Sequence, residues 1–469
     1  MRKLFAARAL APLFLTLPLL AGCAAQIGAP IAPAPERAAV PDDGSLPGLA
    51  AAAVSEDRQG AAAAIARLRA AGPAGLDALF EAHAAAIARL GSPSGPAVDP
   101  EALRVREALE KVARQRDVHA SRLYWYTDLG EARRAARASG KPILSLRLLG
   151  DLDDELSCAN SRFFRTALYP NAKIGEALRS RFILHWKSER PAPRVTIDFG
   201  DGRRLERTVT GNSIHYVLDP EGRVVDALPG MYGPAAFLRG LDDAEGAYRT
   251  TSELPDEERR EALRAYHARQ RDRLIGAWAT LIGVPFGQPL QPRTSDAPAP
   301  GAEVAVMTAV PKARVEAPII EAIQSAPVVP LPDPTNAFAW AALLGQHAAD
   351  ARLDAAGRAF MRAKIATEVD LDGRAMAPLG GAAFERKLAA FERAIAEDTV
   401  RNEYGMRRVL HEWLAMTPPP EDLEGFNQRV YATLFLTPRS DPWLGLLVKD
   451  VYSGIEGEGV RVEASREGR

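Results

Sequence analysis

Apolar and polar positions in the first part of the chain follow a helical period. Residues 49–118 are rich in alanine, and Ile65 and Leu68 lie on one face of the segment 61–71. Leucine and valine recur at similar spacing near the end of this region. Apolar residues three and four positions apart are typical of an amphipathic helix. The pattern predicts an all-helical region over 49–118.

The pattern changes between residues 119 and 250, where short apolar runs alternate with helical segments. Gly140 and Pro142 would end the first of these helices, because glycine and proline favour helix C-termini. Asp219-Pro220-Glu221-Gly222 has the composition of a type I turn between two strands. Strands are predicted at 123–126, 142–149, 182–186, 195–199, 205–209, 215–218 and 223–225, and helices at 129–139, from Cys158 onward and at 234–241.

A helical period returns in the last third of the chain. A helix is expected within 251–285, a Pro/Ala-rich linker at 286–334, and a helical domain over 335–460. Tyr404 and His411 recur at helical spacing, and we interpret them as part of an ordinary helix surface with aromatic anchors. The C-terminal helices are predicted at 335–349, 354–368, 380–396, 398–415 and 421–435.

The first 22 residues have a basic start and a short apolar run, the layout of a secretory signal. Leu20-Ala21-Gly22-Cys23 resembles the lipobox of bacterial lipoproteins. The resemblance implies cleavage before Cys23, a lipid-bearing thioether there, and incorporation of fatty acid such as palmitate. The alternative is an ordinary signal peptide with an incidental cysteine. Ala24 implies a cell-envelope protein anchored in the outer membrane and facing the periplasm. The Ala/Pro-rich residues 23–48 would form a tether.

Composition and net charge limit the number of domains, the kinds of partner and the possible disulfides. A chain of 469 residues with 47% hydrophobic residues has material for two or three domains. The formal net charge of −1 gives no basic excess, so nucleic acid is not an expected partner. The chain has two cysteines, and with Cys23 assigned to lipid, Cys158 is the one remaining thiol. An internal disulfide is then excluded.

The order of elements in the middle region is similar to that of the thioredoxin fold. Four segments carry the resemblance, which covers roughly a quarter of the chain: Gly140 to Leu144, Cys158 to Ser161, Phe182 to Leu184, and Asp219 to Val225. The resemblance implies an α/β thioredoxin-like domain at 119–250, with a central mixed sheet and flanking helices. N- and C-terminal all-α regions would lie on either side.

Cys158 is the candidate catalytic residue, because a thiol at a helix N-terminus is favoured as thiolate. The thioredoxin pattern has a second cysteine where this chain has Ser161, which could hydrogen-bond a thiolate but cannot resolve a disulfide. Ser213 stands where the family has a cis-proline, and acidic residues 151–155 oppose thiolate formation. The favoured function is therefore a membrane-anchored scaffold for an envelope protein partner. The alternative is a monothiol oxidoreductase using Cys158.

His185 and His215 are two strand histidines that could approach Cys158 and form a metal site with it. Thioredoxin-like copper-delivery proteins bind Cu(I) through two cysteines and a histidine, and soft thiolate suits that ion. This chain offers one thiol for such a site. We therefore expect no metal and no other cofactor, with His185 and His215 as the weak candidates.

Overall fold

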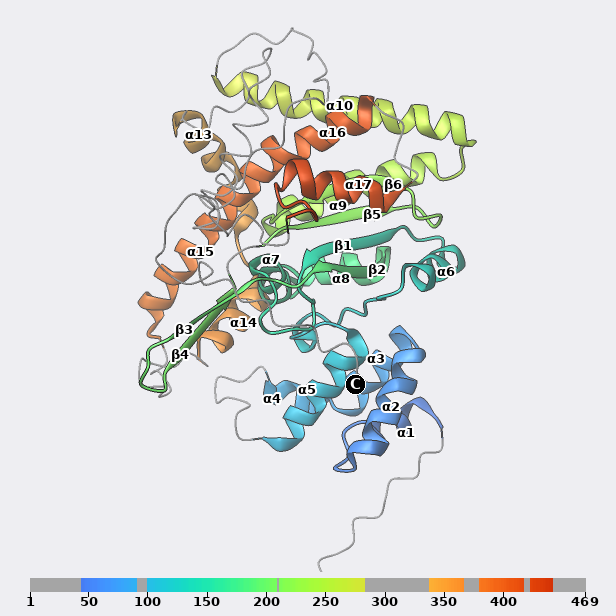
Figure 1. Cartoon of the computed structure of the whole chain (residues 1–469), viewed down its shortest axis with the longest axis vertical. Helices are drawn as coiled ribbons and strands as arrows, with labels where there is room; N and C mark the ends of the chain where they lie inside the picture. Colours follow the sequence, from blue (N-terminus) through green and yellow to red (C-terminus); the bar gives the residue numbers. More distant parts are fainter. Residues whose placement is uncertain are drawn as a thin grey trace, which may run out of the picture. The chain divides into compact units, whose positions relative to one another are not determined.

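A four-stranded mixed sheet lies among helices in a mostly helical α/β structure (Figure 1). The computed structural model describes residues 44–90, 99–208, 211–282, 337–366, 379–416 and 422–441. These residues belong to one compact unit that begins at Asp42. The predicted signal peptide 1–22, Cys23 and the linker 286–334 lie outside the described residues.

The N-terminal helices enclose a small core of their own. Leu68, Leu79 and Leu109 are fully buried in it. Gly75 allows two of these helices to cross closely, since a Cβ there would lie 2.0 Å from the carbonyl oxygen of Leu68. The prediction of helices in this region is confirmed, with the first beginning slightly earlier than expected. The helices are α1 (Leu46–Ala52), α2 (Arg58–Ala70), α3 (Pro73–Ala82), α4 (Ala84–Leu90) and α5 (Pro100–Ala113).

The main sheet has the strand order β2-β1-β5-β6. Strand β1 is parallel to β2 and antiparallel to β5, which pairs with an antiparallel β6. All seven residues of β1 are buried, as expected for a strand covered on both faces. The strands are β1 (Ile143–Leu149), β2 (Ile183–Arg190), β5 (Ser213–Leu218) and β6 (Val224–Pro229).

Helices and short helical turns connect these strands. Helix α6 ends at Gly140, whose φ of 69° is the left-handed conformation that glycine adopts easily. The strand predicted at 123–126 is wrong. Tyr126 makes a single bridge to His185, and the tryptophan before it is buried beside the sheet instead. The elements are η2 (Val118–Ala120), α6 (Leu129–Ser139), α7 (Ala159–Phe163), the π-helical η3 (Phe164–Leu168), α8 (Ala172–Arg181) and α9 (Pro234–Thr251).

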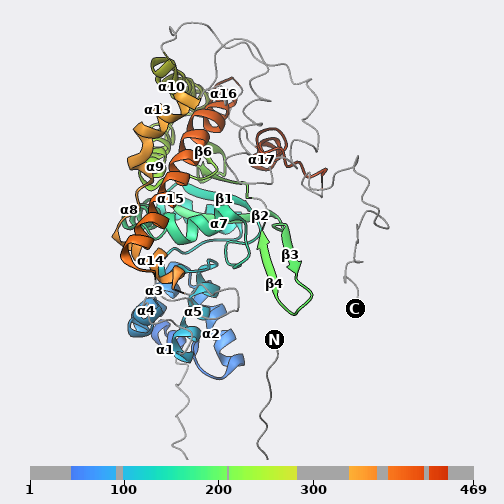
Figure 2. The same ribbon diagram turned by 90° about the vertical axis from the view of Figure 1, so that its left-hand side faces the viewer.

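A separate two-stranded ribbon extends from the end of β2, as both views show (Figures 1 and 2). It consists of β3 (Arg194–Asp198) and β4 (Arg204–Thr208), paired antiparallel. This confirms the predicted hairpin around Gly200 and Gly202, both of which have positive φ.

The C-terminal helices share one hydrophobic core with the sheet. The predicted break at residue 397 is wrong, because α15 continues to Arg401 and passes through a π-helical segment into α16. No described helix is long and apolar enough to cross a membrane. The elements are α10 (Asp256–Ile282), α13 (Ala337–His347), η4 (Ala348–Ala351), α14 (Ala355–Ile365), α15 (Gly381–Arg401), η5 (Asn402–Arg407), α16 (Arg408–Met416), α17 (Leu423–Arg429) and η6 (Val430–Leu434).

Candidate functional site

Cys158 immediately precedes the first residue of α7 and caps that short helix. The backbone N–H of Ser161 donates to the Cys158 Sγ at 3.4 Å. The backbone N–H of Cys158 itself donates to the carbonyl of Leu149, at the end of β1. Unpaired N–H groups at the start of a helix need acceptors, and a sulfur atom here supplies one. The thiol thus has a structural task in the fold.

Ser161 lies where a resolving cysteine would stand in a dithiol enzyme, and it is fully buried. Its hydroxyl accepts a hydrogen bond from the Ser157 hydroxyl at 2.9 Å. The contact from Ser161 to Cys158 therefore runs through the backbone N–H, whereas the sequence suggested a contact through the hydroxyl.

The chain entering β5 lies directly on the start of α7. The Asn160 side-chain amide donates to the Ser213 hydroxyl at 2.6 Å, and both residues are fully buried. Gly211 fits against the same helix start, since a Cβ there would lie 3.2 Å from the backbone nitrogen of Ala159. Residues 211–213 therefore pack against the first residues of α7, directly after Cys158.

A second layer comes from the C-terminal end of the described chain. Asn212 donates to the hydroxyl of Thr437 at 3.1 Å, and Tyr431 donates to the Asn212 carbonyl at 3.3 Å. The Arg190 guanidinium donates to the carbonyls of Thr437 and Asp441, each at 2.9 Å. The segment after α17 is therefore fastened to the loop that lies on α7.

Cys158, beside these contacts at the start of α7, has 0% of its surface exposed. A disulfide or peroxide substrate needs to reach the sulfur along a straight approach, and the folded chain leaves no exposed sulfur for it.

The acidic loop before Cys158 is largely neutralised by arginines. The sequence suggested that these carboxylates would repel a thiolate, but three of them are paired with cations from other elements. The pairs are Asp153 with Arg114 at 3.2 Å, Asp154 with Arg194 at 2.5 Å and Glu155 with Arg116 at 2.5 Å. The carboxylates therefore hold the loop in place between α5 and the ribbon.

His185 and His215 lie on opposite faces of the sheet. His185 pairs with Ser145 in the strand register, and His215 pairs with the next residue, Leu146. Successive side chains of a strand point to opposite faces, so the two imidazoles cannot share one ion. The structure does not bring the weak metal candidates together.

Each of these histidines instead fills a place in the core. The His185 Nδ1 is 2.8 Å from the Ser145 hydroxyl, and the His215 Nε2 is 2.8 Å from the Tyr169 hydroxyl. Burial lowers the pKa of His185 to about 3, and the positive charge of Arg147 adds to this effect. Burial alone lowers the pKa of His215 to about 3. Both are neutral core residues near neutral pH.

A different cluster of ionisable side chains lies where β6, α10 and α16 meet. His267 and His411 face each other with their Nδ1 atoms 2.9 Å apart. The His411 Nδ1 is 3.9 Å from the Asp226 Oδ1. All three residues are buried, and one potential ligand atom from each lies within 4.8 Å of the other two.

Two further side chains hold the carboxylate of this cluster. The Tyr266 hydroxyl donates to the Asp226 Oδ2 at 2.7 Å, and the Arg407 guanidinium donates to the same oxygen at 3.2 Å. Burial opposes ionisation of Asp226, but Arg407, the two histidines and the Tyr266 hydroxyl together outweigh it and lower the pKa of Asp226 to about 2. Burial also lowers the pKa of His267 to about 4. The cluster therefore contains a carboxylate and two neutral imidazoles.

Sequence reasoning missed this cluster because its members are distant along the chain. His411 was noticed only as part of a helix surface with Tyr404, although its imidazole is fully buried. The available signal was Asp226, a charged residue that directly follows the predicted strand 223–225 and interrupts the apolar run 224–228. A buried carboxylate requires a partner, but the sequence does not say which helix supplies it.

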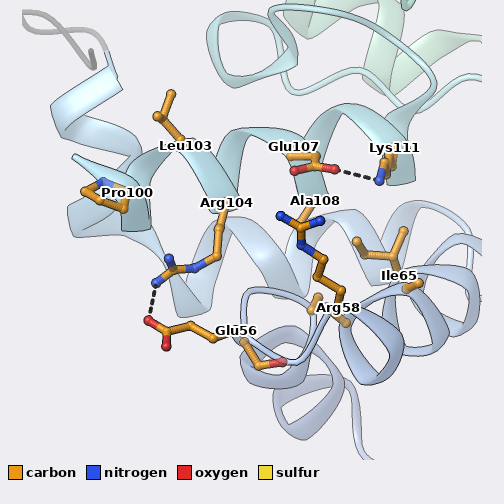
Figure 3. Close-up of a pocket in the computed structure, with 13 residues that line it drawn as sticks. Glu56, Arg58, Ile65, Pro100, Leu103, Arg104, Glu107, Ala108 and Lys111 are labelled. Carbon is orange, nitrogen blue, oxygen red and sulfur yellow. Dashed lines mark hydrogen bonds and ion pairs between the residues drawn. The ribbon is translucent and has the colours of Figure 1, made fainter. Parts of the chain in front are cut away.

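The N-terminal helices form a cleft of about 670 Å³ between α2 and α5 (Figure 3). Its charged side chains are mostly paired with one another. Arg104 is 3.8 Å from Glu56, and Lys111 is 2.7 Å from Glu107. These two pairs offset each other's charge and leave Arg58 as a further cation of the cleft wall, which is too little charge to define a binding site.

Comparison with known proteins gives no further guide to function. No family model, curated protein or solved structure matches this chain. The function is therefore argued from the geometry of the described residues.

Proposed function

We propose that this chain is a lipid-anchored cell-envelope protein whose degenerate thioredoxin-like body is a scaffold that binds an envelope protein. The observation that carries the proposal is the β3–β4 ribbon, which exposes an apolar face. The burial of Cys158 supports a scaffold over the monothiol oxidoreductase. Cys23 lies outside the described residues, so the anchor stays a prediction from the lipobox.

Three features support a thioredoxin-like origin for the body. The sheet places β1 parallel to β2 and next to an antiparallel β5–β6 pair, an order compatible with that fold. Cys158 lies at the start of the helix that follows β1. Ser213, at the proposed cis-proline position, contacts that same helix through Asn160. Ser161 and Ser213 stand where the family has its second cysteine and its cis-proline, and a fold can be retained while its chemistry is lost.

The ribbon is amphipathic. Val195, Ile197 and Phe199 alternate along β3 and its end, so their side chains share one face. They are 42%, 47% and 56% exposed, although each is large and apolar. A row of exposed apolar side chains on one element is typical of an interaction surface.

On the opposite face of the ribbon, charged side chains of β3 and β4 form ion pairs with one another. Arg204 pairs with Asp198 at 3.0 Å across the two strands, and Arg194 lies 3.7 Å from Glu206. At the base, Arg162 donates to the Thr208 hydroxyl at 2.9 Å, which ties the ribbon to α7. The ribbon is thus held at its base with its apolar face outward.

A protein with an apolar groove or strand is the partner that fits this face. A two-stranded ribbon alone in water is marginally stable, so covering its apolar face by a partner would stabilise it. An added strand could also pair with a free edge of the ribbon. The mixed charges of the ribbon, with acidic residues among its arginines, do not favour an anionic lipid surface over a protein.

Photo-crosslinking tests this proposal in the native organism. A photoreactive residue replacing Ile197 is expected to form an adduct with one envelope protein. The same residue replacing Thr196, which points to the opposite face, is the matched control and is expected to give none. The purified partner should then bind the wild-type chain, and binding should be lost in the triple variant Val195→Thr, Ile197→Thr, Phe199→Thr.

The triple variant should keep its fold, because exposed substitutions usually change the free energy of unfolding by about 0.5 kcal/mol or less each. Urea unfolding checks this directly. The proposal is contradicted if position 197 gives no protein adduct, or if the purified partner binds the triple variant as well as wild type. Binding of the ribbon to lipid vesicles without a protein partner would also contradict it.

A further inference from the structure

We propose that Asp226, His267 and His411 together bind one zinc ion, which ties β6 to helices α10 and α16. The proposal concerns a metal site with three protein ligands, in which a water molecule would take the fourth tetrahedral position of zinc. It is independent of the function proposed above, and it rests on the convergence of the three side chains, on their distances and on buried imidazole nitrogens that have no hydrogen-bond partner among the described residues.

The three side chains converge from elements far apart in the sequence. Each offers one nitrogen or oxygen atom, and these atoms lie within 4.8 Å of one another in the interior. Two imidazoles and a carboxylate form a ligand set that suits zinc. Hydrophobic burial alone gives no reason for three polar groups to meet in the core, because each loses its contact with water.

The distances agree with ligation of a common ion. Two atoms that are each about 2.0–2.1 Å from one zinc ion lie about 2.9–4.1 Å apart at angles of 90° or more. The two histidine Nδ1 atoms are 2.9 Å apart, and the His411 Nδ1 is 3.9 Å from the Asp226 Oδ1. The ligand atoms of His267 and Asp226 lie within 4.8 Å of each other, so binding would bring this third pair to about 4.1 Å or less.

The two imidazoles have ring nitrogens whose lone pairs are available to a cation. Two facing Nδ1 atoms can share either one proton or one cation, since each neutral ring can present a lone pair there. The His267 Nε2 and the His411 Nε2 are buried and have no hydrogen-bond partner among the described residues. The His267 ring also makes a hydrogen bond with the backbone of Val225, and a contact of this kind can orient a ligating imidazole.

Neighbouring groups hold both oxygens of the Asp226 carboxylate. Arg407 pairs with Asp226 and, at 3.1 Å, with Glu403, which is also 3.6 Å from Arg273. The backbone N–H of Ala227 donates to the Asp226 Oδ1 at 2.7 Å. Tyr266 and Arg407 both contact the Asp226 Oδ2, so the Oδ1 is the oxygen on the side of His411. Such contacts to the second oxygen orient a ligating carboxylate.

Cobalt titration of the chelator-treated full chain, without a histidine tag, tests the site. Co(II) replaces zinc and absorbs visible light when bound by nitrogen and oxygen ligands, so it reports binding without any activity assay. We expect one Co(II) per chain at micromolar protein, and its displacement by Zn(II). Metal analysis of protein purified after growth with zinc should also give one zinc ion per chain.

Variants locate the ion. His267→Gln and His411→Gln should each weaken Co(II) binding by at least about 100-fold, because each removes one of the protein ligands. His185→Gln is the matched control, since it changes another buried histidine and should leave Co(II) binding unchanged. Circular dichroism confirms that each variant is folded.

The wild-type measurement decides the proposal even if a variant fails to fold. Absence of stoichiometric Co(II) and Zn(II) uptake by the folded wild-type chain would overturn it. Uptake that persists in a folded His267→Gln, His411→Gln double variant would overturn it too, because the ion would then lie elsewhere. In the first case the two imidazoles share a proton, and the cluster is a hydrogen-bonded part of the core.

Discussion

Replacing Arg147 by leucine is expected to lower the free energy of unfolding by about 3–5 kcal/mol, as for other buried ion pairs that lose one partner. Arg147 is in the middle of the buried strand β1, with 0% of its side chain exposed. It contacts Glu189 at 3.2 Å and Glu424 at 2.7 Å. The leucine would leave Glu189, which is 5% exposed, with the half-exposed Arg439, 2.9 Å away, as its remaining cationic partner.

The same substitution should also weaken the attachment of α17 to the sheet. Glu424 is the α17 residue that Arg147 holds, and Lys187 contacts it from the sheet at 3.0 Å. Burial opposes ionisation of Glu424, but the hydrogen bonds and positive charges of Arg147 and Lys187 together outweigh it and keep the pKa of Glu424 below the usual value. Urea unfolding of the purified variant measures the loss of stability.

Two control variants separate charge from packing. Lys187→Leu removes an exposed partner of Glu424 and should cost about 1 kcal/mol or less. The double variant Arg147→Met, Glu189→Met removes both buried charges and should recover most of the stability lost by Arg147→Leu. An Arg147→Leu variant as stable as Lys187→Leu would show that the buried ion pair does not hold the sheet to α17.

A loss of stability on mild acidification is the second large effect that we expect. The folded pKa of His185 and that of His215 are each about 3, below the ordinary histidine value of 6.5. The unfolded chain therefore binds these protons first as the pH falls. The contribution of these two histidines to the free energy of unfolding is therefore fully present above about pH 6.5. It decreases toward pH 3, by about 1.4 kcal/mol per pH unit for each histidine.

Together the two histidines should contribute about 3 kcal/mol per pH unit in this range, which is large beside a typical stability of 5–15 kcal/mol. Urea unfolding between pH 7 and pH 5 measures the slope. His185→Gln should reduce the slope by about 1.4 kcal/mol per pH unit. Ser145→Ala removes the hydrogen-bond partner but no titrating group, so its slope should equal that of wild type. Equal slopes for wild type and His185→Gln would contradict the prediction.

The sequence predicted the elements whose signals are local. Gly140 and Pro142 mark the end of α6, and two glycines mark the turn of the β3–β4 ribbon, where the structure has them. These features depend on backbone conformations that few residues adopt, so a short stretch of sequence is enough to predict them.

Features that depend on long-range packing were not predictable in the same way. The aromatic run 123–126 has the composition of a strand, yet its residues are used to fill the interface between the N-terminal helices and the sheet. The helix expected to stop at residue 396 continues, because the following π-helical segment brings Asn402 to the carbonyl of Met231 at 2.7 Å. Neither the packing of residues 123–126 nor the hydrogen bond from Asn402 can be predicted from the neighbouring sequence.

In the candidate site, too, features with a local sequence signal were predictable and features that depend on long-range packing were not. The placement of Cys158 at a helix start was predictable from the turn and the helical pattern around it. Its complete burial was not, because Gly211 and the segment after α17 provide the cover. The cluster of Asp226 with two histidines required the positions of α10 and α16 relative to β6, which only the fold supplies.

The alkylation rate of Cys158 in the folded chain tests most directly that the body is a sealed scaffold. Iodoacetamide modification should be far slower than in urea-unfolded protein, and its rate should follow global unfolding as urea is raised. Val195→Thr, which leaves the core intact, is the control and should be equally protected. The account would be contradicted by rapid modification of the native chain whose pH dependence gives an apparent thiol pKa below the free value of about 8.5. Such a result would favour the monothiol oxidoreductase.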